Sequence, residues 1–174
     1  HMLDVKAMRA IGGLLARQAR ARAVEADAQA DEVISLGPLL EEWQAGTAEE
    51  PVTYAAGVVR VRYGVPYRCA PPGHTHRGEP GWAPGEAPAL WIPYHATSAE
   101  CALPWERPTG AHDMYKAGEY MIYTDGVTYR AKMDTAYSPE EYAQAWEVAG
   151  SQHDEETDVP EDAETVPSPE DPVT

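Results

Sequence analysis

The chain has 174 residues, a net charge of −16, and ten Tyr and five Trp but no Phe. The acidic balance excludes a nucleic-acid partner, because phosphate binding requires clustered Lys and Arg. No apolar run approaches the ~20 residues that a membrane span requires, so we expect no membrane partner either.

Residues 3–40 are predicted to form a helical N-terminal segment. Met8, Ile11 and Leu15 recur at helical spacing. Gly12-Gly13 weakens the first turns, so the segment is either one helix or two shorter ones. Two roles stay open for it. It is a helix docked on its own domain, or its apolar stripe joins copies of the chain into a homo-oligomer.

Residues 41–93 and 94–147 are predicted to form two β modules. In the first, "GVVRVRYGVPYRC" alternates apolar and polar residues, as a half-buried strand pair does, with a turn at Tyr63-Gly64. In the second, "EYMIYTDGVTYRA" does the same, and Asp125-Gly126 is a strong hairpin signal. The expected fold class is therefore mainly β. It consists of two small antiparallel modules, each a two- to three-stranded hairpin, after the α-helical segment.

The C-terminal segment 148–174 is predicted to be an acidic disordered tail. From Ser151 onward it holds nine acidic residues and no Lys or Arg. Such a composition buries too little apolar surface to offset the entropy of ordering the chain.

The two β stretches are one module written twice. Trp43 and Trp105 open the copies, and Trp91 and Trp146 close them. Between these residues, further pairs match at equal spacing within each copy: Tyr54 and Gly57 with Tyr115 and Gly118, Gly64 and Tyr67-Arg68 with Gly126 and Tyr129-Arg130, and Trp82 and Pro84 with Tyr137 and Pro139. Matches at so many offsets indicate a duplication. We expect the opening Trp, the Tyr and the closing Trp to form a small core in each copy.

The first copy resembles the chitin-binding domains of bacterial chitinases, carbohydrate-binding module families 5 and 12. Their pattern is present as "YRC", "HT", "GWAP" and "PALW", at residues 67–69, 74–75, 81–84 and 88–91. The second copy is a looser version, and its "PTGAHDMYKAGE" is similar to modules of phage tail and other virion proteins.

The resemblance implies non-catalytic binding of chitin or another N-acetylhexosamine polymer. It identifies Trp82 as the ring that stacks on the sugar, and Tyr137 as its counterpart in the second copy. An exposed ring suits this role because a pyranose presents a flat face of C–H groups. The other carbohydrate-binding candidates are His74, Thr75, Pro84 and Trp91. Each module offers a single ring, which predicts weak affinity raised by bivalency.

Other chemistries are not expected. Cys69, His74, His76 and His112 lack the close paired spacing of a zinc site, so no metal and no cofactor are predicted. One disulfide is possible between Cys69 and Cys101, although two reduced thiols are favoured. No catalytic motif occurs, and modules this small make no deep cleft between two carboxylates, so no enzymatic activity is expected.

These features favour a phage virion accessory protein that assembles in the bacterial cytoplasm and adheres to host-surface or mucus-like polysaccharide. By analogy with tail and capsid components, its homo-oligomer would be a trimer. The alternative is a structural virion protein whose modules contact other virion proteins and bind no sugar. Exposure of Trp82 and Tyr137 separates the two hypotheses.

Overall fold

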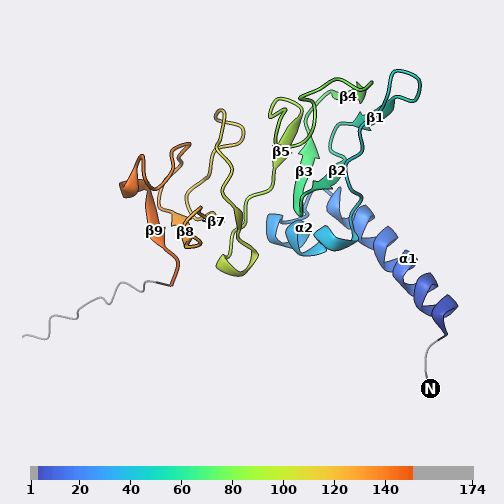
Figure 1. Cartoon of the computed structure of the whole chain (residues 1–174). Coiled ribbons are helices and arrows are strands. Elements are labelled where there is room, and N and C mark those ends of the chain that lie inside the picture. The colour runs from blue at the N-terminus through green and yellow to red at the C-terminus, as the bar shows by residue number, and fades with distance from the viewer. Residues whose placement is uncertain (1–3, 151–174) are drawn as a thin grey trace, which may run out of the picture.

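The computed structural model describes residues 4–150, in which two helices precede nine short strands (Figure 1). The predicted acidic tail lies outside the described residues from position 151 onward. The mainly β character and the N-terminal position of the helices agree with the sequence-based expectation.

The N-terminal segment forms two helices, α1 (Val5–Ala23) and α2 (Ala30–Leu36), followed by a 3-10 turn at Gly37–Leu39. The break does not fall at Gly12-Gly13, through which α1 runs without interruption. It falls after Ala23, where the Arg22 guanidinium stabilises the turn between α1 and α2. This group contacts three carboxylates, those of Glu25 at 2.5 Å, Asp27 at 2.7 Å and Glu32 at 2.7 Å.

The first module contains two small antiparallel sheets. β1 (Val52–Ala55) pairs with β4 (Gly73–His76), while β2 (Val59–Arg62), β3 (Val65–Cys69) and β5 (Trp91–Pro93) form a three-stranded sheet. The predicted turn between β2 and β3 is present, with φ of 51° at Tyr63 and 79° at Gly64. Two successive positive φ angles are typical of the type I′ turn, which matches the twist of a hairpin.

The second module is one four-stranded sheet, in which two 3-10 turns at Ala99–Cys101 and Ala143–Ala145 precede the first and last strands. Its strands are β6 (Leu103–Pro104), β7 (Tyr120–Ile122), β8 (Thr128–Ala131) and β9 (Trp146–Val148). The expectation of purely antiparallel pairing is wrong for β6, which runs parallel to β7. The reason is that the segment leading to the opening Trp of the module runs beside the first strand of the hairpin and in the same direction. The backbone N–H of Trp105 donates there to the Ile122 carbonyl at 2.8 Å.

The two modules share hydrogen bonds at matched positions. The Trp43 N–H donates to Val61 in the first module, as that of Trp105 does to Ile122 in the second, both at 2.8 Å. Two further backbone hydrogen bonds of the first module have counterparts of nearly equal length in the second. The bond from Gly57 N to Cys69 O matches that from Gly118 N to Ala131 O, and the bond from Ala70 N to Leu90 O matches that from Lys132 N to Ala145 O. The repeat in the sequence is thus accompanied by one backbone design in both modules.

Each module has its own aromatic core. Tyr54 and Trp91 are buried in the first, and Tyr115 and Trp146 in the second. The opening tryptophans are partly buried against these clusters. The rings meet edge-on at similar distances: 5.0 Å between the centroids of Tyr54 and Trp91, and 5.4 Å between those of Tyr115 and Trp146.

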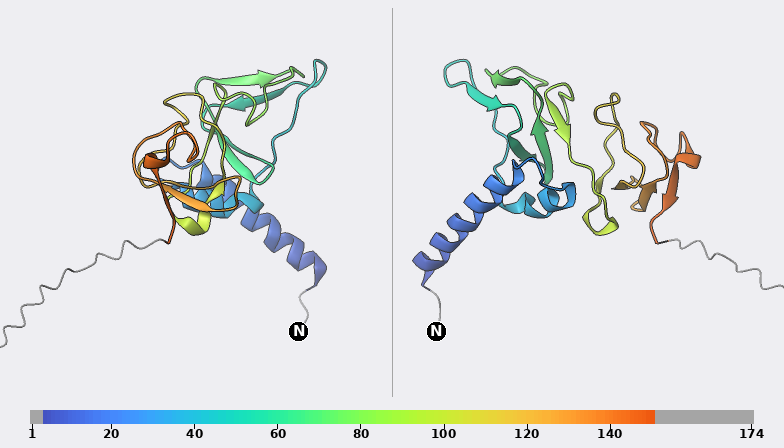
Figure 2. Two further views of the ribbon diagram at one scale, coloured as in Figure 1. Left: turned by 60° about the vertical axis from the view of Figure 1, so that its left-hand side comes forward. Right: turned by 180° about the vertical axis from the view of Figure 1, so that it is seen from behind.

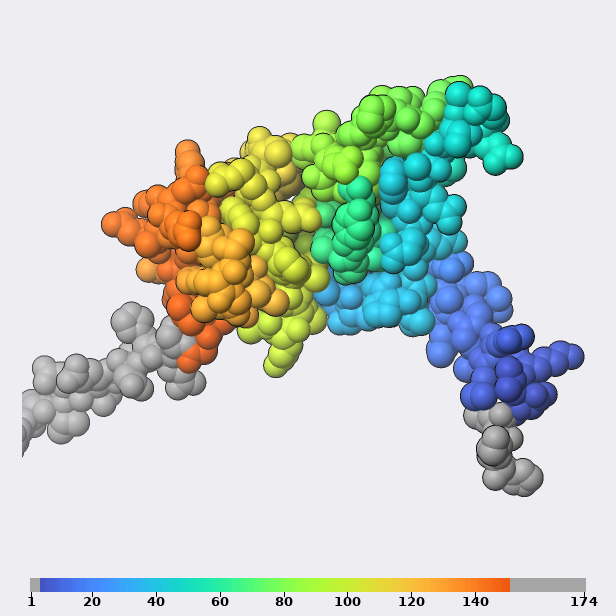
Figure 3. Space-filling model, viewed as in Figure 1, coloured from blue at the N-terminus to red at the C-terminus, as the bar shows by residue number. Residues whose placement is uncertain are grey.

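A third apolar cluster joins the helices to the first module. Ala19 and Ala23 of α1 and Val33 of α2 pack against Val59 and Val61 of β2. Only the C-terminal end of α1 takes part, because the rest of the helix projects from the body (Figures 1 and 3). Among the described residues, no helix has the length and apolar character needed to cross a membrane.

The linker between the modules packs on the second one, and the two modules lie side by side (Figure 2). The ring of His95 stacks on that of Tyr115, with centroids 3.9 Å apart and planes 4° from parallel. In addition, the Tyr67 hydroxyl donates to the Glu106 carboxylate. These contacts order the junction between the modules.

Candidate functional site

The loops that carry Trp82 and Tyr137 are held in the same way. In the first module the indole N–H of Trp91 donates to the Trp82 carbonyl at 3.2 Å. In the second, the indole N–H of Trp146 donates to the Tyr137 carbonyl at 2.9 Å. Each closing tryptophan therefore fixes the backbone beneath the candidate ring.

The two candidate rings differ in exposure. Tyr137 is 58% exposed, whereas Trp82 is only partly exposed. Trp82 meets the rings of His74 and His76 edge-on, at centroid distances of 6.0 and 6.3 Å. Neither ring is buried in its own module, so both retain surface for a ligand.

Pro84 and Trp91 are fully buried. A residue without exposed surface makes no direct contact with a sugar, so we assign both residues to the core of the first module. Trp91 nevertheless supports the site, because it anchors the Trp82 loop from below.

Strand β4 carries the other two candidates. Thr75 is partly exposed, and its hydroxyl pairs with that of Thr53 at 2.9 Å. His74 points toward the core, where its ring lies 5.4 Å from those of both Tyr54 and Trp91. The structure thus brings His74 next to Trp82, as a support for that ring.

His76, which sequence reasoning considered as a metal ligand, is a structural residue. It is 2% exposed, and its Nδ1 accepts hydrogen bonds from the N–H groups of Gly46 at 3.0 Å and Gly78 at 3.1 Å. It joins the loop that contains Gly46 to the loop that contains Gly78, which is distant in the sequence. No local sequence pattern predicts this role.

We expect acid to weaken the first module through His74. Burial lowers the pKa of His74 below its ordinary value of 6.5, and the nearby His76 adds to this effect. The unfolded chain then binds the proton more readily than the native state. The contribution of neutral His74 to the free energy of unfolding is therefore fully present above about pH 6.5, and it is lost as the pH drops below this value.

The variant His74→Thr tests this expectation, because it places in the first module the residue that the second module has at the equivalent position. His74 pairs with Tyr54, as Thr135 pairs with Tyr115. Urea unfolding between about pH 7 and about pH 5 should show a flatter pH dependence for this variant than for the wild type. Equal slopes would rule out His74 as the titrating group.

Tyr63 is an aromatic ring that sequence reasoning placed only in a turn. It is 88% exposed, far more than Trp82 or Tyr137. The sequence contains a sign that Tyr63 is unusual, because a two-residue type I′ turn normally takes Asn, Asp or Gly where this chain has Tyr.

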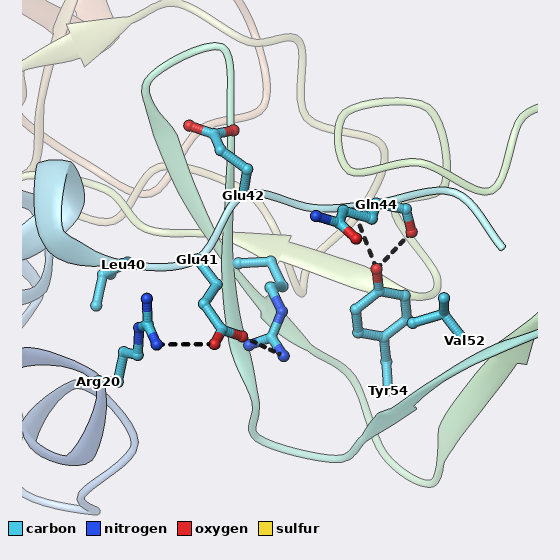
Figure 4. Close-up of a pocket in the computed structure, with 8 residues that line it drawn as sticks. Arg20, Leu40, Glu41, Glu42, Gln44, Val52 and Tyr54 are labelled. Carbon is cyan, nitrogen blue, oxygen red and sulfur yellow. Dashed lines mark hydrogen bonds and ion pairs between the residues drawn. The ribbon is translucent and has the colours of Figure 1, made fainter. Parts of the chain in front are cut away.

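A large pocket lies away from these rings, between α1 and the first module (Figure 4). It has a volume of about 430 Å³, and its charged lining is balanced. The Glu41 carboxylate bridges Arg20 at 3.0 Å and Arg60 at 2.9 Å. Tyr54, at the far side, is 2% exposed. The pocket thus offers no open ring for stacking.

Within residues 4–150, no three His, Cys, Asp or Glu side chains come together in a way that would hold a metal ion. Cys69 and Cys101 are both free thiols. Cys69 is buried, and this burial raises the pKa of its thiol.

Comparison with known proteins finds a partial similarity. The chain is 43% identical over 49 residues to Streptogrisin-C of Streptomyces griseus. This stretch is 28% of the chain and 9% of Streptogrisin-C, so the chain matches only a small part of that protein's length. No model of a protein family matches the chain.

Proposed function

We propose that the protein is a non-catalytic carbohydrate-binding protein that uses Trp82 and Tyr137. The observation that carries the proposal is the shared construction of the two loops. Each holds an aromatic ring at least partly in solvent, through a hydrogen bond from the closing tryptophan. A rigid exposed ring suits the flat C–H face of a pyranose and loses little entropy on binding.

The ligand class proposed is chitin or another N-acetylhexosamine polymer, to which the resemblance of the first module points. We place the protein in a phage virion, where it would adhere to host-surface or mucus-like polysaccharide. We propose no catalytic role for the protein. In the large pocket, both oxygens of the Glu41 carboxylate are engaged by arginines.

Titration with soluble N-acetylglucosamine oligosaccharides tests the proposal through tryptophan fluorescence. Saturable binding that Trp82→Ala weakens is the expected result. A glycan array then identifies the preferred sugar. If no glycan binds, the proposal fails and the alternative of a structural virion protein is favoured.

We further propose that α1 joins copies of the chain, which would multiply weak single-ring sites. Met8, Ile11 and Leu15 are 51%, 48% and 48% exposed, and their spacing places them on the face that carries buried Ala19. Ala19 belongs to the apolar core that joins the helices to the first module, and the part of α1 that precedes it projects beyond the body (Figure 3). The basic residues Lys6, Arg9 and Arg17 lie off this face, with Lys6 and Arg17 opposite it and Arg9 on the flank, so apolar pairing of two helices does not bring them together.

Ile11→Glu combined with Leu15→Glu is therefore expected to reduce the mass measured by light scattering to that of one chain. Charges on the apolar face oppose its burial against a second copy. Arg9→Glu with Arg17→Glu adds the same residues off the apolar face and should leave the oligomer intact. A wild-type protein that is already monomeric would refute self-association.

A further inference from the structure

Tyr63 stands at a position where the fold does not need an aromatic ring. Its φ of 51° lies in the left-handed region, which is unfavourable for a bulky side chain. The equivalent position in the second module is Asp125, whose carboxylate accepts from the Val127 N–H at 2.8 Å and the Tyr129 hydroxyl at 3.0 Å. The second hairpin thus closes with a small polar residue, and the exposed ring of Tyr63 adds nothing to the core.

The ring of Tyr63 is nevertheless held in place by Arg62. The guanidinium carbon of Arg62 lies 4.8 Å from the centroid of Tyr63 and 5.6 Å from that of Trp43. The same guanidinium donates to the Pro84 carbonyl at 2.7 Å and to the Glu86 carboxylate at 2.8 Å. One face of Tyr63 thus rests on an anchored cation, which restricts the ring before any ligand arrives.

These contacts extend to the Trp82 loop, because Pro84 follows Trp82 by two residues. A series of ring contacts also connects Trp82 with Arg62. Trp82 lies 6.3 Å from His76, and His76 lies 5.3 Å from Trp43, against which Arg62 packs. We call the five side chains Trp82, His76, Trp43, Arg62 and Tyr63 the aromatic row. At its two ends stand the partly exposed ring of Trp82 and the exposed ring of Tyr63, while its middle is buried or partly buried.

We propose that Tyr63 is a second sugar-contacting ring of the first module, so that a linear oligosaccharide reaches from Trp82 at one end of the aromatic row to Tyr63 at the other. This inference rests on the proposed function and deepens it, because it makes the first module selective for chain length. A short oligosaccharide reaches only Trp82, whereas a longer one also covers the free face of Tyr63. Arg62 acts as a positioning residue for that ring.

Calorimetric titration with N-acetylglucosamine oligosaccharides of increasing length tests the inference. The full chain carries Tyr137→Ala throughout, so that the first module dominates binding. Tyr63→Asn should bind the shortest oligosaccharides as the parent does and the longest ones roughly two- to tenfold more weakly. Its unfolding temperature should be equal or higher, because Asn tolerates the left-handed conformation. Tyr63→Phe keeps the ring and should bind like the parent.

The outcomes separate this inference from the function on which it rests. If Trp82→Ala loses binding while Tyr63→Asn binds every length like the parent, Tyr63 is not a contact and only this inference is overturned. If Tyr63→Asn loses short and long ligands alike together with stability, the ring is structural. If the wild-type protein binds no oligosaccharide, the proposed function itself is overturned.

Discussion

Trp91→Ala is expected to destabilise the first module by about 3–5 kcal/mol, the range for removal of a large buried aromatic side chain. The indole of Trp91 has no exposed surface and packs against Tyr54 and His74. The variant also removes the hydrogen bond to the Trp82 carbonyl. Urea unfolding followed by near-ultraviolet circular dichroism measures the loss.

Trp82→Ala is the control for this experiment. It removes the same kind of ring from a partly exposed position, so it should cost much less stability than Trp91→Ala. If Trp91→Ala were as stable as the wild type yet failed to bind sugar, Trp91 would be a ligand contact and its placement in the core would be wrong.

The second large effect is expected for Trp82→Ala combined with Tyr137→Ala on insoluble chitin. A polymer surface engages both modules of one chain, so two weak sites act together. In the Ile11→Glu and Leu15→Glu background, where each chain acts alone, each single variant should lose the gain from bivalency, on the order of 10²-fold or more in apparent affinity, and the double variant should lose retention altogether. Depletion of the protein from solution by a chitin suspension measures these losses.

Soluble short oligosaccharides provide the contrast, because they reach one module at a time. There, each single variant should remove one class of site and leave the dissociation constant of the other unchanged. Tyr142→Ala is a matched control, since Tyr142 is also an exposed tyrosine of the second module, at 40%. Loss of retention in this variant would show that the effect does not belong to the ring of Tyr137.

Local patterns predicted much of the fold. The hairpin turns at Tyr63-Gly64 and Asp125-Gly126 join the strands that the alternating residues indicate. The closing tryptophans, Trp91 and Trp146, are buried as expected of rings that small modules need for a core. Turn residues and a two-residue period are visible in any short stretch of sequence, which explains this success.

Features that depend on distant residues were not predictable. The chain break after α1 depends on Arg22 meeting Glu32, ten residues further on. The pairing of β1 with β4 joins residues such as Val52 and His76 across a long intervening hairpin. Helix propensity and alternation carry no information about such contacts, because they act only over one or two turns of chain.

The candidate site shows the same division. The matched offsets of Trp82 and Tyr137 in the repeat identify two rings that the structure leaves at least partly in solvent. The contributions of His76 and Arg62 arise from loops brought together by folding. Pro84 and Trp91 belong to the same family pattern as Trp82 but are buried in the core, a difference that spacing alone does not reveal.

Retention of the wild-type protein on insoluble chitin, compared with that of the Trp82→Ala and Tyr137→Ala double variant, tests whether these two rings bind the polymer. We expect the wild type to be depleted from solution while the double variant, with its fold intact by circular dichroism, stays in the supernatant. Equal retention of the two proteins, or no retention of the wild type on chitin, would contradict this expectation.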